Sequence, residues 1–155
     1  MAERPRDVIA DLKRERTLFR LFEDSELEVI SPYFEPEEHP KGTTLFREGD
    51  PGDFVAVIRS GTVEVRKQTE FEGKWVVLAQ FGRGSILGEL TMFDNRPRSA
   101  TVLVSEDVEL LVLRRDAMEA FLQEHPALGV KLLKGVCRIL SLRLRQSAKR
   151  LTLIF

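Results

Sequence analysis

The sequence predicts a mainly β fold, an antiparallel double-stranded β-helix or jelly roll with N-terminal helices and a long C-terminal helix. Between Phe34 and Arg114, apolar and polar residues alternate in short runs that turn residues separate, a pattern typical of β-strands. No part of this region is long enough for a crossover helix, so the strands must pair antiparallel. After Pro126 about 30 residues follow without another proline, which indicates one long helix.

The chain of 155 residues suits a single domain, which we divide into three regions. Residues 1–33 are expected to form an N-terminal helical cover. Residues 34–114 are expected to form the β core that carries the binding site. Residues 115–155 are expected to form the C-terminal helices.

The helical cover is expected to contain two or three short helices. Apolar residues fall loosely at helical spacing between Val8 and Phe22, which indicates one or two of them. Ser25 and Glu28 have the spacing of a capping box for another helix, and Pro32 must end it.

The β core is expected to contain strands wherever the period-two pattern runs between turn signals. Two of the expected breaks lie at residues 60–61 and 106–107, where Ser-Gly and Glu-Asp pairs favour turns. The expected strands are residues 43–47, 54–59, 62–68, 75–81, 98–105 and 108–114.

Composition excludes several classes of protein. The chain is 43% apolar and 32% charged with a net charge of −1, values typical of a soluble globular protein. No run approaches the roughly 20 apolar residues of a membrane span, and no apolar signal peptide opens the chain. We expect a cytoplasmic protein without a transmembrane segment.

The sequence offers no catalytic or metal-binding cluster. Cys137 is the only cysteine, which excludes an internal disulfide, and we interpret it as a small packed residue of an apolar helix. His39 and His125 both precede prolines and lie far apart, which argues against a metal site or a catalytic triad. We expect no enzyme activity, no metal and no cofactor.

The C-terminal segment differs in charge from the rest of the chain. Residues 127–155 carry seven basic residues and no acidic one, whereas residues 1–126 carry 17 basic and 25 acidic. Apolar and small residues in the segment alternate steps of four and three, the seam of a coiled coil. This seam consists of Leu133, Cys137, Leu140, Leu144, Ser147 and Leu151. We expect a homodimer through residues 127–155, the alternative being packing of the helix onto its own domain.

Residues 85–102, SILGELTMFDNRPRSATV, carry the strongest functional signal. Gly88 has no Cβ and allows a ligand to approach the backbone, and residues 89–93 make about one helical turn whose first N–H groups attract a phosphate. Arg98 adds a charged fork suited to phosphate oxygens. Glu89 repels phosphate but accepts hydrogen bonds from a hydroxyl. The stretch therefore predicts a small anionic ligand that carries hydroxyl groups.

Simpler interpretations exist for these residues one at a time. Glu89 alone would be an acid at a helix terminus and Arg98 a surface charge at a strand end. Gly84 and Gly88 alone would be turn glycines, but their position relative to Glu89 and Arg98 favours ligand contact. For Gly42, Gly49, Gly52 and Gly61 we retain the interpretation as plain turns.

The stretch resembles the phosphate-binding cassette of the cyclic nucleotide-binding domain family, to which the sensor module of the catabolite activator protein belongs. The matching residues are Gly88, Glu89 and Leu90, then, after a turn, Arg98, Ser99 and Ala100. The resemblance implies that Glu89 holds the ribose 2′-hydroxyl, that Arg98 holds the cyclic phosphate and that Ser99 adds a phosphate hydrogen bond.

In that family the long C-terminal helix also caps the purine. The corresponding stretch here is Arg143 and Leu144 where the catabolite activator protein has a Thr-Ser pair, and an arginine can stack on a purine. The complete set of candidate ligand-binding residues is Ile86, Leu87, Gly88, Glu89, Leu90, Arg98, Ser99, Ala100 and Arg143.

We therefore expect a non-catalytic sensor that binds a cyclic nucleotide, cyclic AMP first, and repositions its long helix. The alternative is a ligand-independent dimeric scaffold whose basic helix meets an acidic protein partner, nucleic acid or an anionic membrane. No helix-turn-helix follows the long helix, so we expect no sequence-specific DNA binding within the chain. The chain is then either a free-standing sensor or a piece of a longer protein, and the sequence names no downstream partner.

Overall fold

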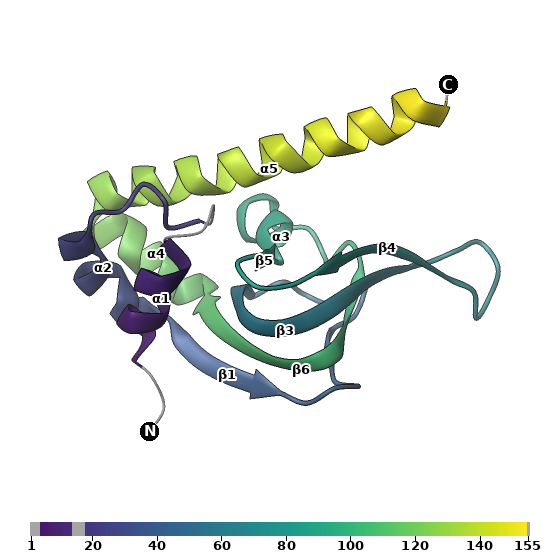
Figure 1. Cartoon of the computed structure of the whole chain (residues 1–155), viewed down its shortest axis with the longest axis horizontal. Coiled ribbons are helices and arrows are strands. Elements are labelled where there is room, and N and C mark those ends of the chain that lie inside the picture. The colour runs from purple at the N-terminus through teal and green to yellow at the C-terminus, as the bar shows by residue number, and fades with distance from the viewer. Residues whose placement is uncertain (1–3, 14–17, 155) are drawn as a thin grey trace.

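The structure is a computed structural model and describes residues 4–13 and 18–154. A rolled antiparallel sheet lies beside a group of helices, and the last helix, α5, runs across both (Figure 1). The helices outside the sheet are α1 (Pro5–Lys13), α2 (Asp24–Ile30), the 3-10 helix η1 (Ser31–Tyr33), α4 (Arg115–Glu124) and α5 (Pro126–Ile154). The strands are β1 (Glu35–His39), β2 (Thr44–Phe46), β3 (Phe54–Gln68), β4 (Trp75–Phe81), β5 (Ile86–Leu87) and β6 (Thr101–Arg114), and α3 (Glu89–Asp94) lies between the last two. The predicted fold class is confirmed.

The sheet is built around β3 and β6, which pair with each other along most of their length. The strand order is β1-β6-β3-β4, β2 pairs with β6, and β5 pairs with β3. The predicted breaks at residues 60–61 and 106–107 are wrong, because β3 and β6 each run through them. Gly61 has φ +84° and a Cβ there would lie 2.1 Å from Asp107 O, so the turn residues form a bulge within the pair instead of ending the strands.

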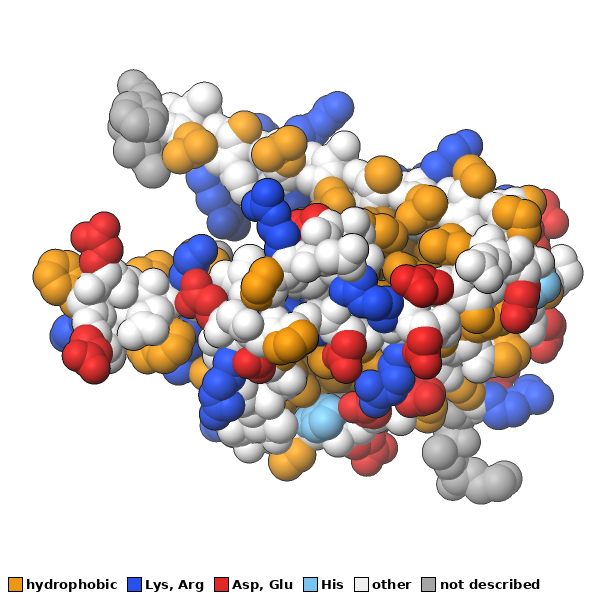
Figure 2. All heavy atoms as spheres, turned by 180° about the vertical axis from the view of Figure 1, so that it is seen from behind, with side chains coloured by type: hydrophobic (Ala, Val, Ile, Leu, Met, Phe, Trp, Pro, Cys, Tyr) orange, Lys and Arg blue, Asp and Glu red, His pale blue; other side chains and the backbone are white. Residues whose placement is uncertain are grey.

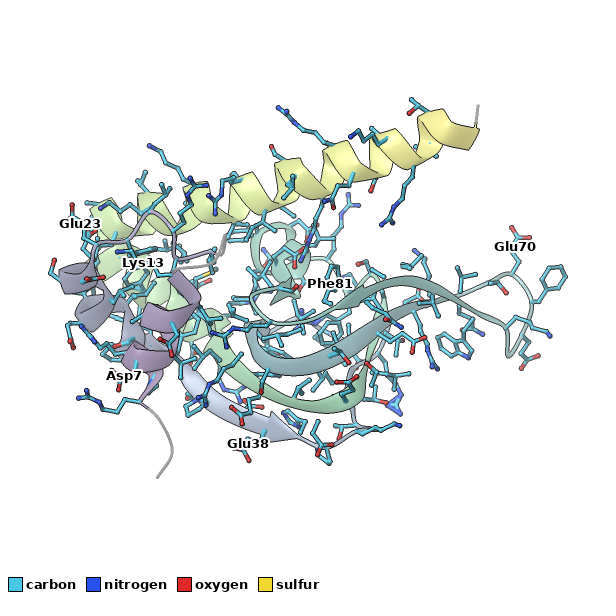
Figure 3. All side chains as sticks on the ribbon, viewed as in Figure 1. Asp7, Lys13, Glu23, Glu38, Glu70 and Phe81 are labelled. Atoms are coloured by element: carbon cyan, nitrogen blue, oxygen red, sulfur yellow. The ribbon has the colours of Figure 1, made fainter. Side chains whose placement is uncertain are left out.

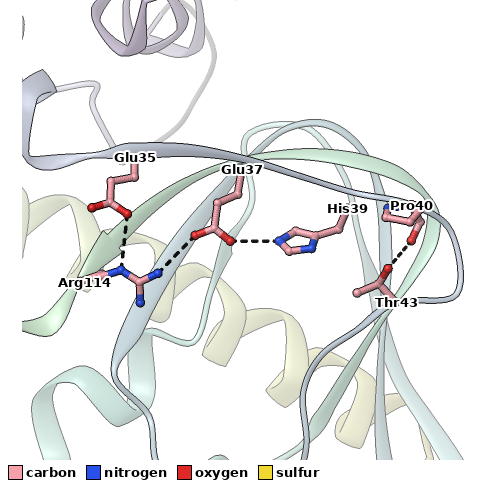
Figure 4. Close-up of polar contacts among 6 residues, drawn as sticks. All are labelled: Glu35, Glu37, His39, Pro40, Thr43 and Arg114. Atoms are coloured by element: carbon pink, nitrogen blue, oxygen red, sulfur yellow. Dashed lines mark hydrogen bonds and ion pairs between the residues drawn. The ribbon is translucent and has the colours of Figure 1, made fainter.

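Strand β1 was not among the predicted strands. Its sequence, Glu-Pro-Glu-Glu-His, lacks the apolar alternation of a strand, yet it pairs antiparallel with β6 from Glu35 to His39. Arg114 of β6 lies 3.4 Å from Glu35 and 3.6 Å from Glu37, and Glu37 lies 3.0 Å from His39 (Figure 4). Charged side chains therefore line this edge strand, a common protection of sheet edges.

Two hydrophobic clusters share the central strands. Val55 and Val57 of β3 belong to the cluster with the helices, whereas Ala56 and Ile58 belong to the cluster inside the roll. The same alternation occurs in β6. Because successive side chains of a strand point to opposite faces, the central strands are buried on both faces and tie the helical cover to the β roll.

The helical cover differs from the prediction in its capping. Only α1 is described in the segment predicted to hold one or two helices, and residues 14–17 lie outside the described ranges. The capping box predicted at Ser25 and Glu28 is wrong: α2 starts at Asp24, and the backbone N–H of Glu23 donates to Glu26 Oε1 at 2.8 Å. Glu26 also accepts from Lys131 of α5, and this hydrogen bond lowers the pKa of its carboxyl.

Helix α5 has a packed half and an exposed half. In the first half Leu132 and Val136 are buried, and a Cβ on Gly135 would lie 2.5 Å from Leu18 O. From residue 141 to 152 every residue is exposed except Arg143, and Figure 2 shows a gap between the C-terminal end of the helix and the body. Cys137 is exposed, so its interpretation as a packed core residue is wrong. Among the described residues, no helix is both long and apolar enough to cross a membrane.

Candidate functional site

The predicted ligand-binding residues come together in one pocket of about 130 Å³ between the β roll, α3 and α5. All nine of them line it, including Arg143, which is distant in sequence. The pocket also contains five residues that the sequence did not single out, namely Phe46, Val65, Phe81, Thr91 and Val102. Gly84 does not line the pocket, and its backbone N–H donates to Ile58 O at 2.7 Å.

Gly88 forms the entry from β5 into α3. Its φ of +80° lies in the left-handed region that L-residues avoid. A Cβ at this position would lie 2.2 Å from Arg98 Nη1 and 3.1 Å from Phe54 O. The glycine therefore serves two purposes, the sharp turn into α3 and the space for the arginine side chain.

The loop before β3 fixes the backbone of Arg98. Arg98 N–H donates to Asp50 O at 2.8 Å, and Gly49 N–H donates to Arg98 O at 2.8 Å. The side chain is fixed by separate hydrogen bonds, the first of which runs from Nη2 to Phe54 O at 2.8 Å. Nη1 donates to Gly88 O at 3.2 Å and to Thr91 Oγ1 at 3.0 Å.

The guanidinium of Arg98 is a buried cation whose direct hydrogen-bond partners are all neutral. The side chain is 2% exposed, which rules out the simpler interpretation as a surface charge. Its Cζ lies 4.0 Å from the ring centroid of Phe46 and 4.6 Å from that of Phe54. Burial lowers the pKa of Arg98, and the negative charge of Asp53 opposes this effect. Within the described part of the chain, Nε has no hydrogen-bond partner.

This environment fits an anion. A buried charge is stable only when an opposite charge or hydrogen bonds compensate it. The carbonyl and hydroxyl acceptors satisfy part of the guanidinium, but they carry no net charge. An anionic ligand in the pocket would place a compensating negative charge beside the guanidinium.

Glu89 is the second buried charge of the pocket and is 6% exposed. It is the first residue of α3, and its Oε1 accepts a hydrogen bond from Arg143 Nη1 of α5. Arg143 Nη2 donates to Ile86 O at 2.8 Å. Its Cζ lies 4.6 Å from the ring centroid of Phe81, the residue labelled below α5 in Figure 3. Stacking of Arg143 on a purine stays a prediction.

The remaining predicted residues complete the walls. Ile86, Leu87 and Ala100 are buried, whereas Leu90 and Ser99 are exposed. Leu90 belongs to α3, and Ser99 and Ala100 connect Arg98 to β6. The pocket therefore offers apolar walls together with two cations, Arg98 and Arg143, and one carboxylate, Glu89.

Four of the five residues that sequence reasoning missed lie on strands, and the fifth, Thr91, lies in α3. Phe46 belongs to β2 and Phe81 to β4, and only the rolling of the sheet brings them beside the cassette. Thr91 lies inside the cassette, three residues after Gly88. A signal for it existed, because a threonine at that spacing can bond the backbone of the preceding turn.

Comparisons with known proteins agree with this geometry. Residues 36–125 match the family described as the cyclic nucleotide-binding domain. A CRP-like cAMP-activated global transcriptional regulator of Mycobacterium tuberculosis is 31% identical over 139 residues, which cover 89% of this chain and 60% of that protein. A cAMP-dependent protein kinase regulatory subunit of Aspergillus fumigatus is 35% identical over 85 residues, covering 55% of this chain and 20% of that protein.

A solved structure shows the same fold. The cyclic nucleotide-binding domain from Methylobacillus flagellatus superposes with a TM-score of 0.84 at 33% identity, covering 94% of this chain and 81% of that one. The match to the family spans more than half of the chain, and the pocket holds the residues of the cassette in one place. The chain belongs to the cyclic nucleotide-binding domain family.

Proposed function

We propose that this chain is a non-catalytic sensor that binds a cyclic nucleotide, cyclic AMP before cyclic GMP, in the pocket between α3, the β roll and α5. The observation that carries the proposal is the buried guanidinium of Arg98, held by neutral acceptors and with Nε unpartnered among the described residues. A cyclic phosphate supplies the negative charge that these neutral partners lack. The Mycobacterium tuberculosis and Aspergillus fumigatus relatives, whose names mention cAMP, support cyclic AMP as the first candidate.

Glu89 is the group we assign to the ribose. Its carboxylate accepts hydrogen bonds only, so it suits the 2′-hydroxyl and repels the phosphate. Leu90, Ser99 and Ala100 line the same pocket, and we assign Ser99 to a phosphate oxygen. Ile86 and Leu87 supply apolar wall beneath the ligand.

Arg143 is the group through which we expect the pocket to reach α5. It is the one side chain between residues 141 and 152 that is not exposed, and it bonds the same carboxylate that we assign to the ribose. A ribose hydroxyl at Glu89 must share or displace this contact. Binding therefore favours one arrangement of α5 over another, which is the requirement for a ligand to shift a conformational equilibrium.

We also propose that two copies of the chain associate through α5. Leu133, Leu144 and Leu151 of the predicted seam are exposed, and Cys137 lies exposed between them in the same pattern. A second copy of the helix covers a row of exposed leucines with an identical row.

Titration calorimetry tests the proposed function. We expect heat of binding with cyclic AMP at near-physiological salt, and a loss of about 2 to 5 kcal/mol in Arg98→Ala, because the substitution removes a buried charge that pairs with the phosphate. That is at least roughly a 30-fold loss in affinity. Arg96→Ala is the matched control, since Arg96 is exposed two residues away.

Two further titrations sharpen the assignment. The 2′-deoxy analogue of cyclic AMP is expected to bind more weakly by about 1.5 to 3 kcal/mol, the value of a hydrogen bond to a charged group. Cyclic GMP tests the base preference. An absence of heat with both cyclic nucleotides, with α5-mediated dimerisation retained, would instead favour the ligand-independent scaffold with its basic helix.

A further inference from the structure

We propose that Thr91 is a positioning residue for Arg98: its hydroxyl, in the first turn of α3, fixes the guanidinium in the orientation that receives the phosphate. The inference rests on the proposed function. It concerns a residue that lines the pocket and whose hydroxyl contacts the guanidinium of Arg98.

Thr91 is 3% exposed, and its hydroxyl has two described contacts. Oγ1 donates to Gly88 O at 3.2 Å and accepts from Arg98 Nη1 at 3.0 Å. A hydroxyl has one hydrogen to give, and Gly88 O is an acceptor only. The hydrogen therefore points to Gly88, and the lone pairs face the guanidinium.

The contact restricts the arginine in a specific way. Nη1 bonds Thr91 and Gly88, while Nη2 bonds Phe54 O on a different element. A guanidinium whose two terminal nitrogens have separate acceptors cannot turn about its Nε–Cζ bond without breaking both sets. The plane of the guanidinium is thus fixed before a ligand arrives, which lowers the entropic cost of binding.

Both the backbone and the side chain of Thr91 are fixed by neighbouring residues. Arg115 Nη2 donates to the backbone carbonyl of Thr91 at 2.8 Å. On the side-chain end, Gly52 packs so closely that a Cβ there would lie 2.0 Å from Thr91 Oγ1. Gly52 was interpreted as a plain turn glycine, but its φ is not positive. The close approach to Thr91 is what requires glycine at this position.

A purely local role of the hydroxyl would explain its bond to Gly88 O but not its bond from Arg98. Threonine hydroxyls often bond the carbonyl three or four residues earlier in a helix, and the bond to Gly88 O is of this kind. The bond from Arg98 is different, because it joins a buried cation to a buried neutral hydroxyl. Hydrogen bonds to charged groups are the stronger class, so loss of the hydroxyl should loosen the orientation of the Arg98 guanidinium.

The test compares Thr91→Val, which removes the hydroxyl at nearly constant volume, with Thr91→Ser, which keeps it. Calorimetry with cyclic AMP is expected to show about fivefold to tenfold weaker binding for Thr91→Val and affinity within about twofold of wild type for Thr91→Ser. Thr91→Ala is a second variant without the hydroxyl. Thr62→Val is the matched control, because its hydroxyl bonds Ser105 between β3 and β6.

A measurement without nucleotide separates this inference from the proposed function. ¹⁵N NMR of the wild type is expected to resolve distinct Nη–H signals of Arg98, and Thr91→Val is expected to average them. Averaging in Thr91→Val would uphold the positioning role even if the wild type bound no cyclic nucleotide. Unchanged signals together with unchanged affinity would overturn it. Weaker binding that Thr91→Ser fails to restore would also overturn it, since packing and not the hydroxyl would then be responsible.

Discussion

Glu89 shows how one residue can join the pocket to a distant helix. Its carboxylate is buried in the first turn of α3, and its described partner is Arg143 of α5. A buried charge that loses its partner is destabilising, whereas replacing both partners by neutral groups costs less. The strength of this contact can therefore be measured by substituting either side chain or both and comparing the free energies of unfolding.

We expect Arg143→Gln to lower the free energy of unfolding by about 1 to 3 kcal/mol, because it leaves the Glu89 carboxylate without its cation. The double variant Glu89→Gln/Arg143→Gln should lose much less stability than the sum of the losses in the two single variants. Urea unfolding of the four proteins without nucleotide measures the coupling. Arg145→Gln, an exposed residue of the same helix, serves as control, and a coupling near zero would contradict the contact.

Helix α5 illustrates how a single element can combine an anchored and an exposed half. The anchored half packs against the helical cover, where Gly135 lies against the carbonyl of Leu18 and Lys131 bonds Glu26. The exposed half has Arg143 as its contact with the pocket. Under the proposed function, this contact is the route by which a ligand in the pocket would act on α5.

Two glycines of α5 allow a matched test of the anchored half. Alanine in place of glycine favours a helix by about 1 kcal/mol at both positions. A Cβ on Gly129 would first meet Leu122 Cδ2 at 2.7 Å, the end of a flexible side chain, whereas a Cβ on Gly135 would meet a backbone oxygen at 2.5 Å. We expect Gly135→Ala to be less stable than Gly129→Ala by about 1 kcal/mol or more, as measured by urea unfolding. Equal stability would show that α5 does not approach the cover this closely.

At the scale of the whole molecule, the exposed leucines of α5 are the basis for the proposed dimer. Sedimentation at micromolar concentration is expected to show a dimer for the wild type and a monomer for Leu144→Glu, because a charge on the seam opposes its own copy across a two-fold axis. Leu142→Glu is the control: this leucine is also exposed but lies off the seam. A monomeric wild type, or a dimer that survives Leu144→Glu, would contradict the seam.

Cys137 provides an independent readout of the same assembly. It is exposed, and it is the only cysteine of the chain. In a parallel dimer with the helices in register, the two copies of Cys137 face each other along the seam. Mild oxidation should then give a cross-linked dimer in the wild type, and a much lower yield in Leu144→Glu. Equal cross-linking of both proteins would point to random collision.

The sequence by itself determined the parts of this protein that depend on neighbouring residues. The period-two runs indicated the antiparallel sheet, the uninterrupted segment after Pro126 indicated α5, and Gly88, Glu89 and Arg98 marked the pocket within one short stretch. Each of these signals is local, because side-chain periodicity and turn chemistry act over a few residues.

Only the tertiary structure decided the features that join distant residues. Arg143 reaches Glu89 from 54 positions away in the sequence, and Phe81 enters the pocket because the sheet rolls. Strand β1 forms through pairing with β6 despite its acidic sequence, and the strand pair β3 and β6 absorbs turn residues as a bulge. The physical reason is common to all of them: burial and hydrogen bonding between segments outweigh local propensity, and which segments meet is settled only when the whole chain packs.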